Sequence, residues 1–184
     1  MGSIVPAGAV RSSLAFPEDM NLTFTSIDNY RAGCIVELLT RSYHALLQED
    51  ISFRTSEVPK WREFDREVVS TPDIFRGCIF FSWLDENLVG FGSFDPRPKP
   101  EFGIVGHNCI LPEFRNRGLG KQQLREILLR LEEIGIKLVK ASTNEHPFFL
   151  PAQKMYTACG FHEVCRVKIN GKENNVIHYE IEIG

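Results

Sequence analysis

The sequence lacks any apolar run long enough to cross a bilayer, and neither sign of charge is in large excess. A transmembrane helix needs about 20 consecutive apolar residues, and no stretch of the 184 residues approaches that length. The formal net charge is −3, so the basic footprint of a nucleic-acid-binding protein is missing. We therefore expect neither a membrane nor a nucleic acid as a partner.

The distribution of the cysteines argues against a disulfide scaffold. The five cysteines are an odd number scattered through apolar stretches, which is typical of buried thiols in a reducing compartment and favours a cytoplasmic location. Cys159, His162 and Cys165 stand close together, but no paired Cys-x-x-Cys accompanies them. We predict no metal site.

What is present is ordinary globular composition, with 43% hydrophobic and 24% charged residues. Residues 1–19 contain Pro6, Pro17 and many small residues, with Arg11 as the one basic residue. They lack the long apolar block of a signal peptide, and we expect a flexible N-terminal arm. Residues 20–184 are enough for one domain with a core of its own.

The periodicity of residues 20–184 predicts an α/β (α+β) domain with element order β-α-α-β-β-β-α-β-α-β-β. A helix capped by Asp28 or Asn29 runs to about residue 46, residues 48–56 are polar and irregular, and a second helix begins at Pro59. The other helices are expected at 119–134 and 147–159. Strands are expected at 22–26, 79–84, 88–94, 102–111, 136–142, 161–169 and 176–183, with a hairpin turn at 170–172.

Residues 110–121 carry the strongest chemical signal. A strand runs into a short loop with Gly118 and Gly120, and a helix opens there. A helix N-terminus offers unpaired N–H groups and the positive end of the dipole, and glycines let a phosphate approach them. Arg115 and Arg117 add charge that can pair with phosphate oxygens. The pattern predicts a pyrophosphate site, with a plain loop before a solvated helix as the alternative.

Two other phosphate-binding motifs are excluded by single residues. A Walker loop requires Ser or Thr after its lysine, but Gln122 follows Lys121, and no glycine stands five residues before Gly120. The dinucleotide fingerprint requires a third glycine at position 123, which is Gln.

Two motifs together resemble a known family. Ile110-x-Pro112 followed by Arg115-x-x-Gly118-x-Gly120 resembles the acyl-CoA signature of the GNAT family of N-acetyltransferases. Ala152-x-x-x-Tyr156-x-x-x-Gly160-Phe161 resembles the second landmark of that family. The resemblance covers essentially residues 20–184, and the order of elements is similar too.

The resemblance implies a single-domain acyl-CoA N-acyltransferase fold, with a mixed, mostly antiparallel sheet flanked by helices and splayed open between strands ending near Leu111 and Ser142. Acetyl-CoA would be the co-substrate, with its pantetheine arm on the backbone of Ile110 and Leu111. A polar residue that orients substrate or water often stands where this chain has Asn144. The implied cofactor-binding residues are Ile110, Leu111, Arg115, Asn116, Arg117, Gly118, Leu119, Gly120, Lys121 and Asn144.

The implied reaction is direct attack of a primary amine on the thioester. Tyr156 would protonate the leaving thiolate, unless it is only a core aromatic. His107 is the first candidate for the general base because its ordinary pKa lies near neutrality, with Glu101 and Asp95 as alternatives. We do not expect Cys109 to carry the acyl group, because no His–Asp relay is visible in the sequence.

The acceptor stays open between a small-molecule amine and a peptide or protein amine. The resemblance implies that the acceptor binds to residues in the region of about 43–61. A non-catalytic acyl-CoA sensor or interaction module with the same fold is the rival function. The sequence also leaves open whether the chain forms a homodimer.

Overall fold

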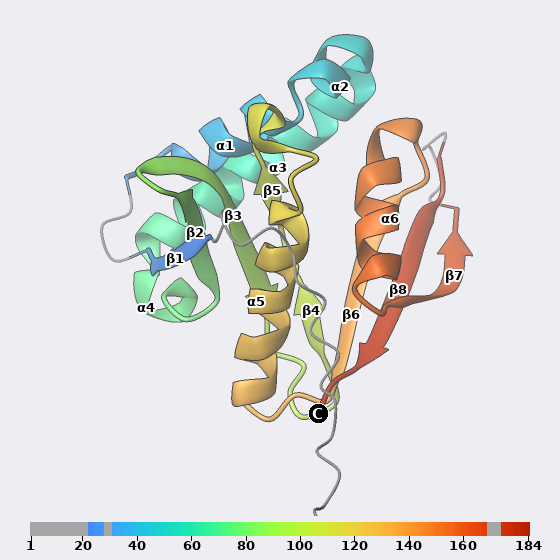
Figure 1. The fold of residues 1–184 in the computed structure, drawn as a ribbon. Helices are drawn as coiled ribbons and strands as arrows, with labels where there is room; N and C mark the ends of the chain where they lie inside the picture. The colour runs from blue at the N-terminus through green and yellow to red at the C-terminus, as the bar shows by residue number, and fades with distance from the viewer. Residues whose placement is uncertain (1–21, 28–30, 169–173) are drawn as a thin grey trace, which may run out of the picture.

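A mixed sheet of eight strands forms the centre of the computed structural model, which describes residues 22–27, 31–168 and 174–184 (Figure 1). The strand order is β1-β2-β3-β4-β6-β8-β7, and β5 pairs with β3. Every strand pair is antiparallel except β4 with β6, which confirms the predicted mostly antiparallel sheet. The strands are β1 Thr23–Ser26, β2 Ile79–Leu84, β3 Asn87–Asp95, β4 Gly103–Val105, β5 Cys109–Ile110, β6 Leu138–Asn144, β7 His162–Val167 and β8 Val176–Glu182.

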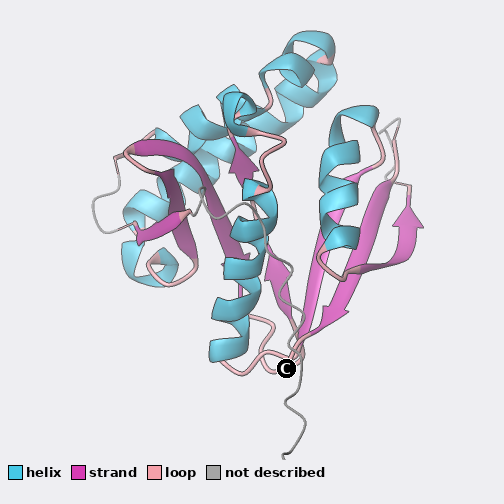
Figure 2. Ribbon diagram, viewed as in Figure 1, coloured by secondary structure: helices cyan, strands magenta, loops and turns pink. Residues whose placement is uncertain are grey.

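Helices flank both faces of this sheet (Figure 2). They are α1 Cys34–Ser42, α2 His44–Glu49, α3 Ile51–Ser70, α4 Pro72–Phe75, α5 Leu119–Glu133 and α6 Leu150–Ala158, with 3₁₀ turns η1 Pro112–Phe114 and η2 Pro147–Phe149. Among the helices of the described ranges, no segment combines the length and the apolar character that crossing a membrane requires.

The alternation of side chains in β2 explains how the layers pack. Ile79 and Phe81 join the core beneath α1 and α3, whereas Phe80 between them joins the core beneath α5 and α6. Successive strand residues point to opposite faces of the sheet. The buried residues of β2 therefore contribute to the hydrophobic core on both faces.

The N-terminal helices differ from the prediction. The expected single helix is divided at Tyr43 into α1 and α2. Residues 51–56, expected to be irregular, are helical because the Asp50 carboxylate accepts from the N–H of Phe53 at 2.9 Å and caps α3. Pro59 consequently lies inside α3 rather than in its first turn.

The expected strand 102–111 is also divided. It forms β4 and β5, separated by residues 106–108. The break stays attached to β3 because Gly106 N–H donates to the Ser93 carbonyl at 2.9 Å and Ser93 Oγ donates to the His107 carbonyl at 2.7 Å. This irregular segment presents His107 and Asn108 beside the site described below.

Three expectations lie wholly or partly outside the described residues. These are the flexible arm at 1–19, the cap at Asp28 or Asn29, and the hairpin turn at 170–172.

Candidate functional site

The sheet opens between its two halves, as the resemblance implies. β4 pairs with β6 through Gly103 with Val139 and Ile104 with Lys140. Beyond that point β5 follows β3, while β6 continues with β8 as far as Asn144. Within the described ranges no ladder joins β5 to β6, and the two strands diverge in Figure 1. We call the space between β5 and the second half of β6 the sheet opening.

The backbone of Ile110 faces the sheet opening. Leu111 N–H donates to the Val89 carbonyl at 2.8 Å, and its carbonyl accepts from Phe114 N–H at 2.9 Å. Successive strand residues direct their N–H groups to opposite sides, so Ile110 directs its own away from β3. Of the two residues expected to hold a pantetheine arm, Ile110 therefore has the suitable N–H, and that of Leu111 is already engaged.

The start of α5 forms the predicted anion site, which we call the glycine loop (residues 115–120). Asn116 and Gly118 have left-handed backbones, with φ of 62° and 79°. Gly118 is the N-cap of α5 and provides no side-chain cap. The N–H groups of Leu119 and Gly120 lie in the first turn, which has no intrahelical acceptors. Uncapped N–H groups beside left-handed residues suit a phosphate.

The two arginines of the glycine loop have different surroundings. Arg115 Nε donates to the Ile110 carbonyl at 3.0 Å and its Nη2 to the Ser42 carbonyl at 2.5 Å. Arg117 is exposed, and its Nη2 donates to the Glu113 carbonyl at 3.2 Å. Sequence reasoning treated both as phosphate ligands, but the Arg115 guanidinium ties the loop to β5 and α1. Arg117 and the half-buried Lys121 are the cations at the surface of this helix start.

Tyr156 is buried on α6, with 4% of its surface exposed. Its ring contacts Phe161 and Tyr179, both at centroid distances of 5.4 Å. Burial raises the pKa of Tyr156 to about 12, and a hydrogen bond with the Asn108 side chain opposes part of that rise. The phenol therefore stays protonated at neutral pH and can act as a proton donor.

His107 lies in the break between β4 and β5, with its ring 5.3 Å from the ring of Phe64. Although the residue as a whole is exposed, the protein packed around its ring withdraws water and lowers the pKa of His107. The charge of Glu57 raises that pKa and the charge of Lys60 lowers it, both to a smaller extent. The net shift favours the neutral imidazole, which is the form a general base requires.

The two alternative bases lie elsewhere. Asp95 is paired with Arg97, whose Nε is 2.8 Å from Asp95 Oδ1. Glu101 is exposed and lies two residues before Gly103. Gly103 packs closely against the Leu131 side chain, in the last turns of α5. Leu131 is about 16 Å along the helix from Gly120, at 1.5 Å per residue. Both carboxylates are therefore at the end of α5 opposite the glycine loop.

Asn144 organises the turn after β6. Its Oδ1 accepts from His146 N–H at 2.7 Å, and its carbonyl accepts from Gln153 Nε2 at 3.0 Å. The amide oxygen that was expected to orient a substrate is therefore engaged in the chain's own turn into η2.

Sequence reasoning missed an aromatic cluster that joins the two sides of the sheet opening. Tyr43, between α1 and α2, contacts Trp61 of α3 at 5.2 Å between ring centroids. It also contacts Phe148 and Phe149 of η2 at 5.5 and 5.9 Å. The signal was the Phe-Phe pair after Pro147, whose partners could not be identified from the sequence.

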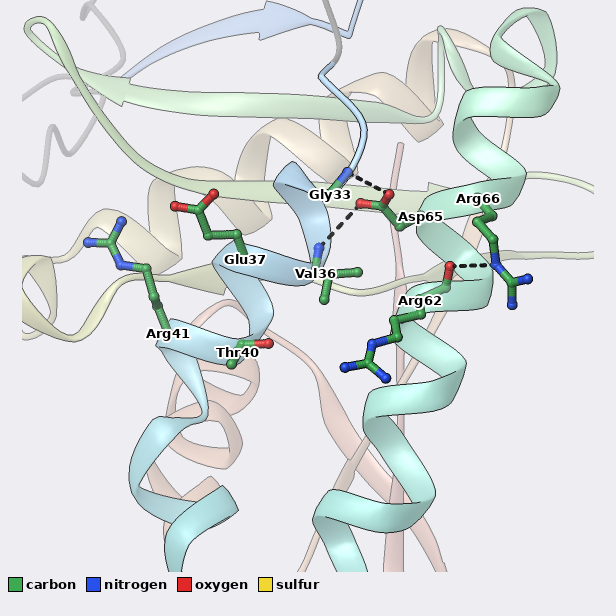
Figure 3. A pocket seen from close by; sticks show the side chains of 8 residues that line it. All are labelled: Gly33, Val36, Glu37, Thr40, Arg41, Arg62, Asp65 and Arg66. Carbon is green, nitrogen blue, oxygen red and sulfur yellow. Dashed lines mark hydrogen bonds between the residues drawn. The ribbon is translucent and has the colours of Figure 1, made fainter.

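A cavity of about 620 Å³ lies away from these groups, between α1 and α3 (Figure 3). The Asp65 carboxylate beside it accepts from the N–H groups of Gly33 at 2.8 Å and Val36 at 3.4 Å, which ties α3 to the start of α1. None of the glycine loop, Tyr156 or His107 lines it, so we place the candidate site at the sheet opening. The lining residues are Gly33, Val36, Glu37, Thr40, Arg41, Arg62, Asp65 and Arg66.

Two other chemistries find little support in the described part of the chain. No group of three or more His, Cys, Asp or Glu residues is arranged to hold a metal there. Cys109 is buried, which raises the pKa of its thiol to about 11 and keeps the nucleophilic thiolate scarce.

Comparison with known proteins agrees with this geometry. In structure the chain is similar to a proposed GNAT acetyltransferase from Desulfovibrio desulfuricans, with a TM-score of 0.70, 18% identity, and coverage of 88% of this chain and 99% of that one. It is also similar to yncA from Salmonella typhimurium, determined with its cofactor acetyl-CoA, with a TM-score of 0.62, 14% identity and coverage of 88% and 93%.

A third similar structure is the ribosomal-protein-S18-alanine N-acetyltransferase of Escherichia coli, with a TM-score of 0.64, 14% identity and coverage of 89% and 94%. At these identities the likeness shows the fold alone. No curated protein sequence matches the chain. The model of the Acetyltransferase (GNAT) family, however, matches residues 37–161. On this match, together with the splayed sheet and the glycine loop, the chain belongs to the GNAT acetyltransferase family.

Proposed function

We propose that this chain is an N-acetyltransferase that moves the acetyl group of acetyl-CoA to a primary amine by direct attack in a ternary complex. One arrangement carries the proposal: the start of α5, which has no side-chain cap, lies on one side of the sheet opening, and α6, the helix that carries Tyr156, lies on the other (Figure 1). The first can hold a pyrophosphate and the second can protonate a thiolate.

The proposed binding mode of acetyl-CoA uses the backbone more than side chains. The pyrophosphate would accept from N–H groups of residues 116–120, with Arg117 and Lys121 adding positive charge. Gly118 has no Cβ and no atom near the place where one would be, so a phosphate can approach the backbone there. The Ile110 N–H would pair with an amide carbonyl of the pantetheine arm.

The chemical step then needs a base for the ammonium and an acid for the departing sulfur. The neutral imidazole of His107 accepts a proton from the ammonium, and the freed nitrogen lone pair attacks the thioester carbonyl carbon. The C–S bond breaks as Tyr156 donates its proton to the departing sulfur, and the second proton lost by the nitrogen restores the phenol. Each positioned proton transfer typically contributes about 10²- to 10⁴-fold to the rate, and holding the partners together contributes further.

The compartment is part of the proposal. All five cysteines lie in the described part of the chain, and all are free thiols. Free thiols are stable in a reducing environment, so we place the enzyme in the cytoplasm, acting on a small-molecule or peptide amine.

The test is a thiol-release assay with acetyl-CoA and a panel of small and peptide amines. We expect release of free CoA that depends on the amine, with matching N-acetylated product. Double-reciprocal plots should intersect, as a ternary complex requires, and Cys109→Ala should remain active. If the chain binds CoA but no amine accelerates thiol release, the non-catalytic sensor is the correct function. Parallel lines with an acetylated Cys109 would contradict direct attack.

A further inference from the structure

One face of α3 carries a carboxylate among aromatic rings. Phe53, Glu57, Trp61 and Phe64 recur at spacings of four, four and three residues, which places them on one side of the helix. We call this set the α3 face. Phe53 and Trp61 contact the ring of Tyr43 at 6.1 and 5.2 Å, and Phe64 contacts the ring of His107 at 5.3 Å.

Glu57 therefore lies on the helix between Phe53 and Trp61, which both contact Tyr43, and two turns before Phe64, which contacts His107. Its side chain is only 16% exposed. Its charge reaches both neighbours, because it raises the pKa of Tyr43 and that of His107. A carboxylate held among aromatic rings loses hydration, which favours a cationic partner.

Two polar partners of Glu57 belong to its own helix. Lys60 Nζ is 2.8 Å from Glu57 Oε1, and the Ser56 hydroxyl donates to the same oxygen at 3.2 Å. Lys60 is 59% exposed, so this pair is formed from the solvent side. The charge of Arg115 also acts on Tyr43 and lowers its pKa.

The wall facing the α3 face is aromatic as well. Phe149 of η2 contacts Phe53 at 6.1 Å and Tyr43 at 5.9 Å between ring centroids. Tyr43, Phe53 and Phe149 are all half-buried. Each therefore keeps part of its surface accessible, against which a flat apolar group can pack.

We propose that Glu57 binds the ammonium of the acceptor and that Tyr43, Phe53 and Phe149 bind a flat apolar group attached to it. The acceptor is then a primary amine that carries an aromatic or similarly flat apolar group and no carboxylate next to the nitrogen. This inference rests on the proposed N-acetyltransferase function.

Three physical reasons select this class. An ammonium is attracted by a carboxylate and by aromatic faces. An aromatic group buries apolar surface against rings that are already positioned. A carboxylate beside the amine would be repelled by Glu57, so an aromatic amino acid should be a poorer acceptor than the matching amine. The charge of Glu57 also raises the pKa of His107, so the proposed ammonium site lies within electrostatic range of the proposed base.

The test compares phenethylamine, phenylalanine and ethanolamine as acceptors in the thiol-release assay. For the wild-type chain we expect kcat/KM for phenethylamine to exceed that for each of the other two by at least tenfold. Glu57→Gln keeps the shape of the side chain but removes its charge. It should raise the KM for phenethylamine at least tenfold and leave the affinity for acetyl-CoA unchanged.

Two further variants separate charge from shape. Phe149→Ala should reduce the preference for phenethylamine over ethanolamine, and Lys60→Gln, which removes only the solvent-side partner, should not raise the KM for phenethylamine. If Glu57→Gln does not fold, Glu57→Met, which is also neutral and of similar length, serves in its place. Comparable rates with phenethylamine, phenylalanine and ethanolamine, or an unchanged KM in the folded Glu57 variant, would overturn the inference while the acetyltransferase function stands. Absence of acetylation with every amine would instead contradict the proposed function itself.

Discussion

A Cβ on Gly120 would stand 3.1 Å from the sulfur of Met155, so the first turn of α5 packs directly against α6. The absence of a side chain at Gly120 therefore has two effects. It leaves space for α6 on one side, and it leaves the helix start open to a phosphate on the other. The same residue joins the anion site to the helix that carries Tyr156.

The first prediction concerns substitutions of Gly120. Gly120→Ala should change stability little, because better helix propensity, worth up to about 1 kcal/mol, is offset by a contact that the flexible Met155 side chain can relieve. Gly120→Glu adds bulk and negative charge at the proposed pyrophosphate site. We expect calorimetry to show at least a tenfold loss of CoA affinity in Gly120→Glu.

Thermal unfolding is the control, since only folded variants are informative about binding. Undiminished CoA affinity in a folded Gly120→Glu variant would contradict the proposed binding mode.

The second prediction separates the two arginines of the glycine loop. Arg115→Gln removes charged hydrogen bonds to the Ile110 and Ser42 carbonyls, and such bonds contribute about 1.5–3 kcal/mol each. It should lower the melting temperature. Arg117→Gln should leave the melting temperature unchanged but weaken CoA binding, more so at low ionic strength. The reverse pattern, with Arg115 affecting only affinity, would show that the assignment is wrong.

Local signals in the sequence predicted the elements that carry the two motifs. Helix α5 was expected at 119–134 and runs from Leu119 to Glu133, because an apolar stripe and a glycine start fix it locally. The stripe residues Leu124, Ile127 and Leu131 are all buried. The order of strands and the mixed sheet followed from equally local alternation and turn residues.

What the sequence did not reveal depends on contacts between distant residues. The carbonyl that engages Arg115 belongs to Ser42, 73 residues earlier, so a charge that looked free for phosphate is committed to the fold. The polar composition of residues 48–56 concealed the start of α3. The sequence placed the start of this helix at Pro59, so Phe53 and Glu57 lay outside it. They could not be assigned to the helix face that carries Trp61 and Phe64. The carboxylate of Glu57, which we now propose to bind the acceptor, was therefore missed.

The third prediction is the pH dependence of the reaction. Burial holds the pKa of His107 below its ordinary value of 6.5, and only the neutral ring can accept a proton. The rate should therefore be lost as pH falls through that lowered pKa and be constant above it, until another group titrates. We expect kcat measured between pH 5 and 8 to show this acidic limb in the wild-type chain.

His107→Gln should be slower throughout and should lack the acidic limb. Phe64→Leu is the matched control for His107→Gln, because it keeps the base and changes only the ring that packs against it. In Phe64→Leu the acidic limb of the pH profile should persist, at a shifted pH. If His107→Gln shows the same acidic limb as the wild-type chain, another group is the base, and Glu57 would be the next residue to test.

The last prediction concerns Tyr156, whose hydroxyl is buried beside Asn108 and whose pKa is raised to about 12. A donor with this pKa stays protonated throughout the usable pH range, so it should contribute no inflection to the pH profile. Tyr156→Phe keeps the ring packed against Phe161 and Tyr179 and removes only the proton donor. Because a thiolate leaves readily, we expect kcat to fall by about a hundredfold, the lower end for general acid catalysis.

The apparent affinity for acetyl-CoA should stay nearly constant in Tyr156→Phe, because an interaction made only in the transition state affects kcat and kcat/KM equally. Asn108→Ala is the control: it leaves the donor in place and should slow the reaction much less. An acyl donor with a better leaving thiol, such as a thiophenyl thioester, should also narrow the gap in kcat between wild type and Tyr156→Phe, since a more acidic thiol needs the proton less. If Tyr156→Phe turns over at the wild-type rate with acetyl-CoA, the residue is a core aromatic and the acid must be found elsewhere in the sheet opening.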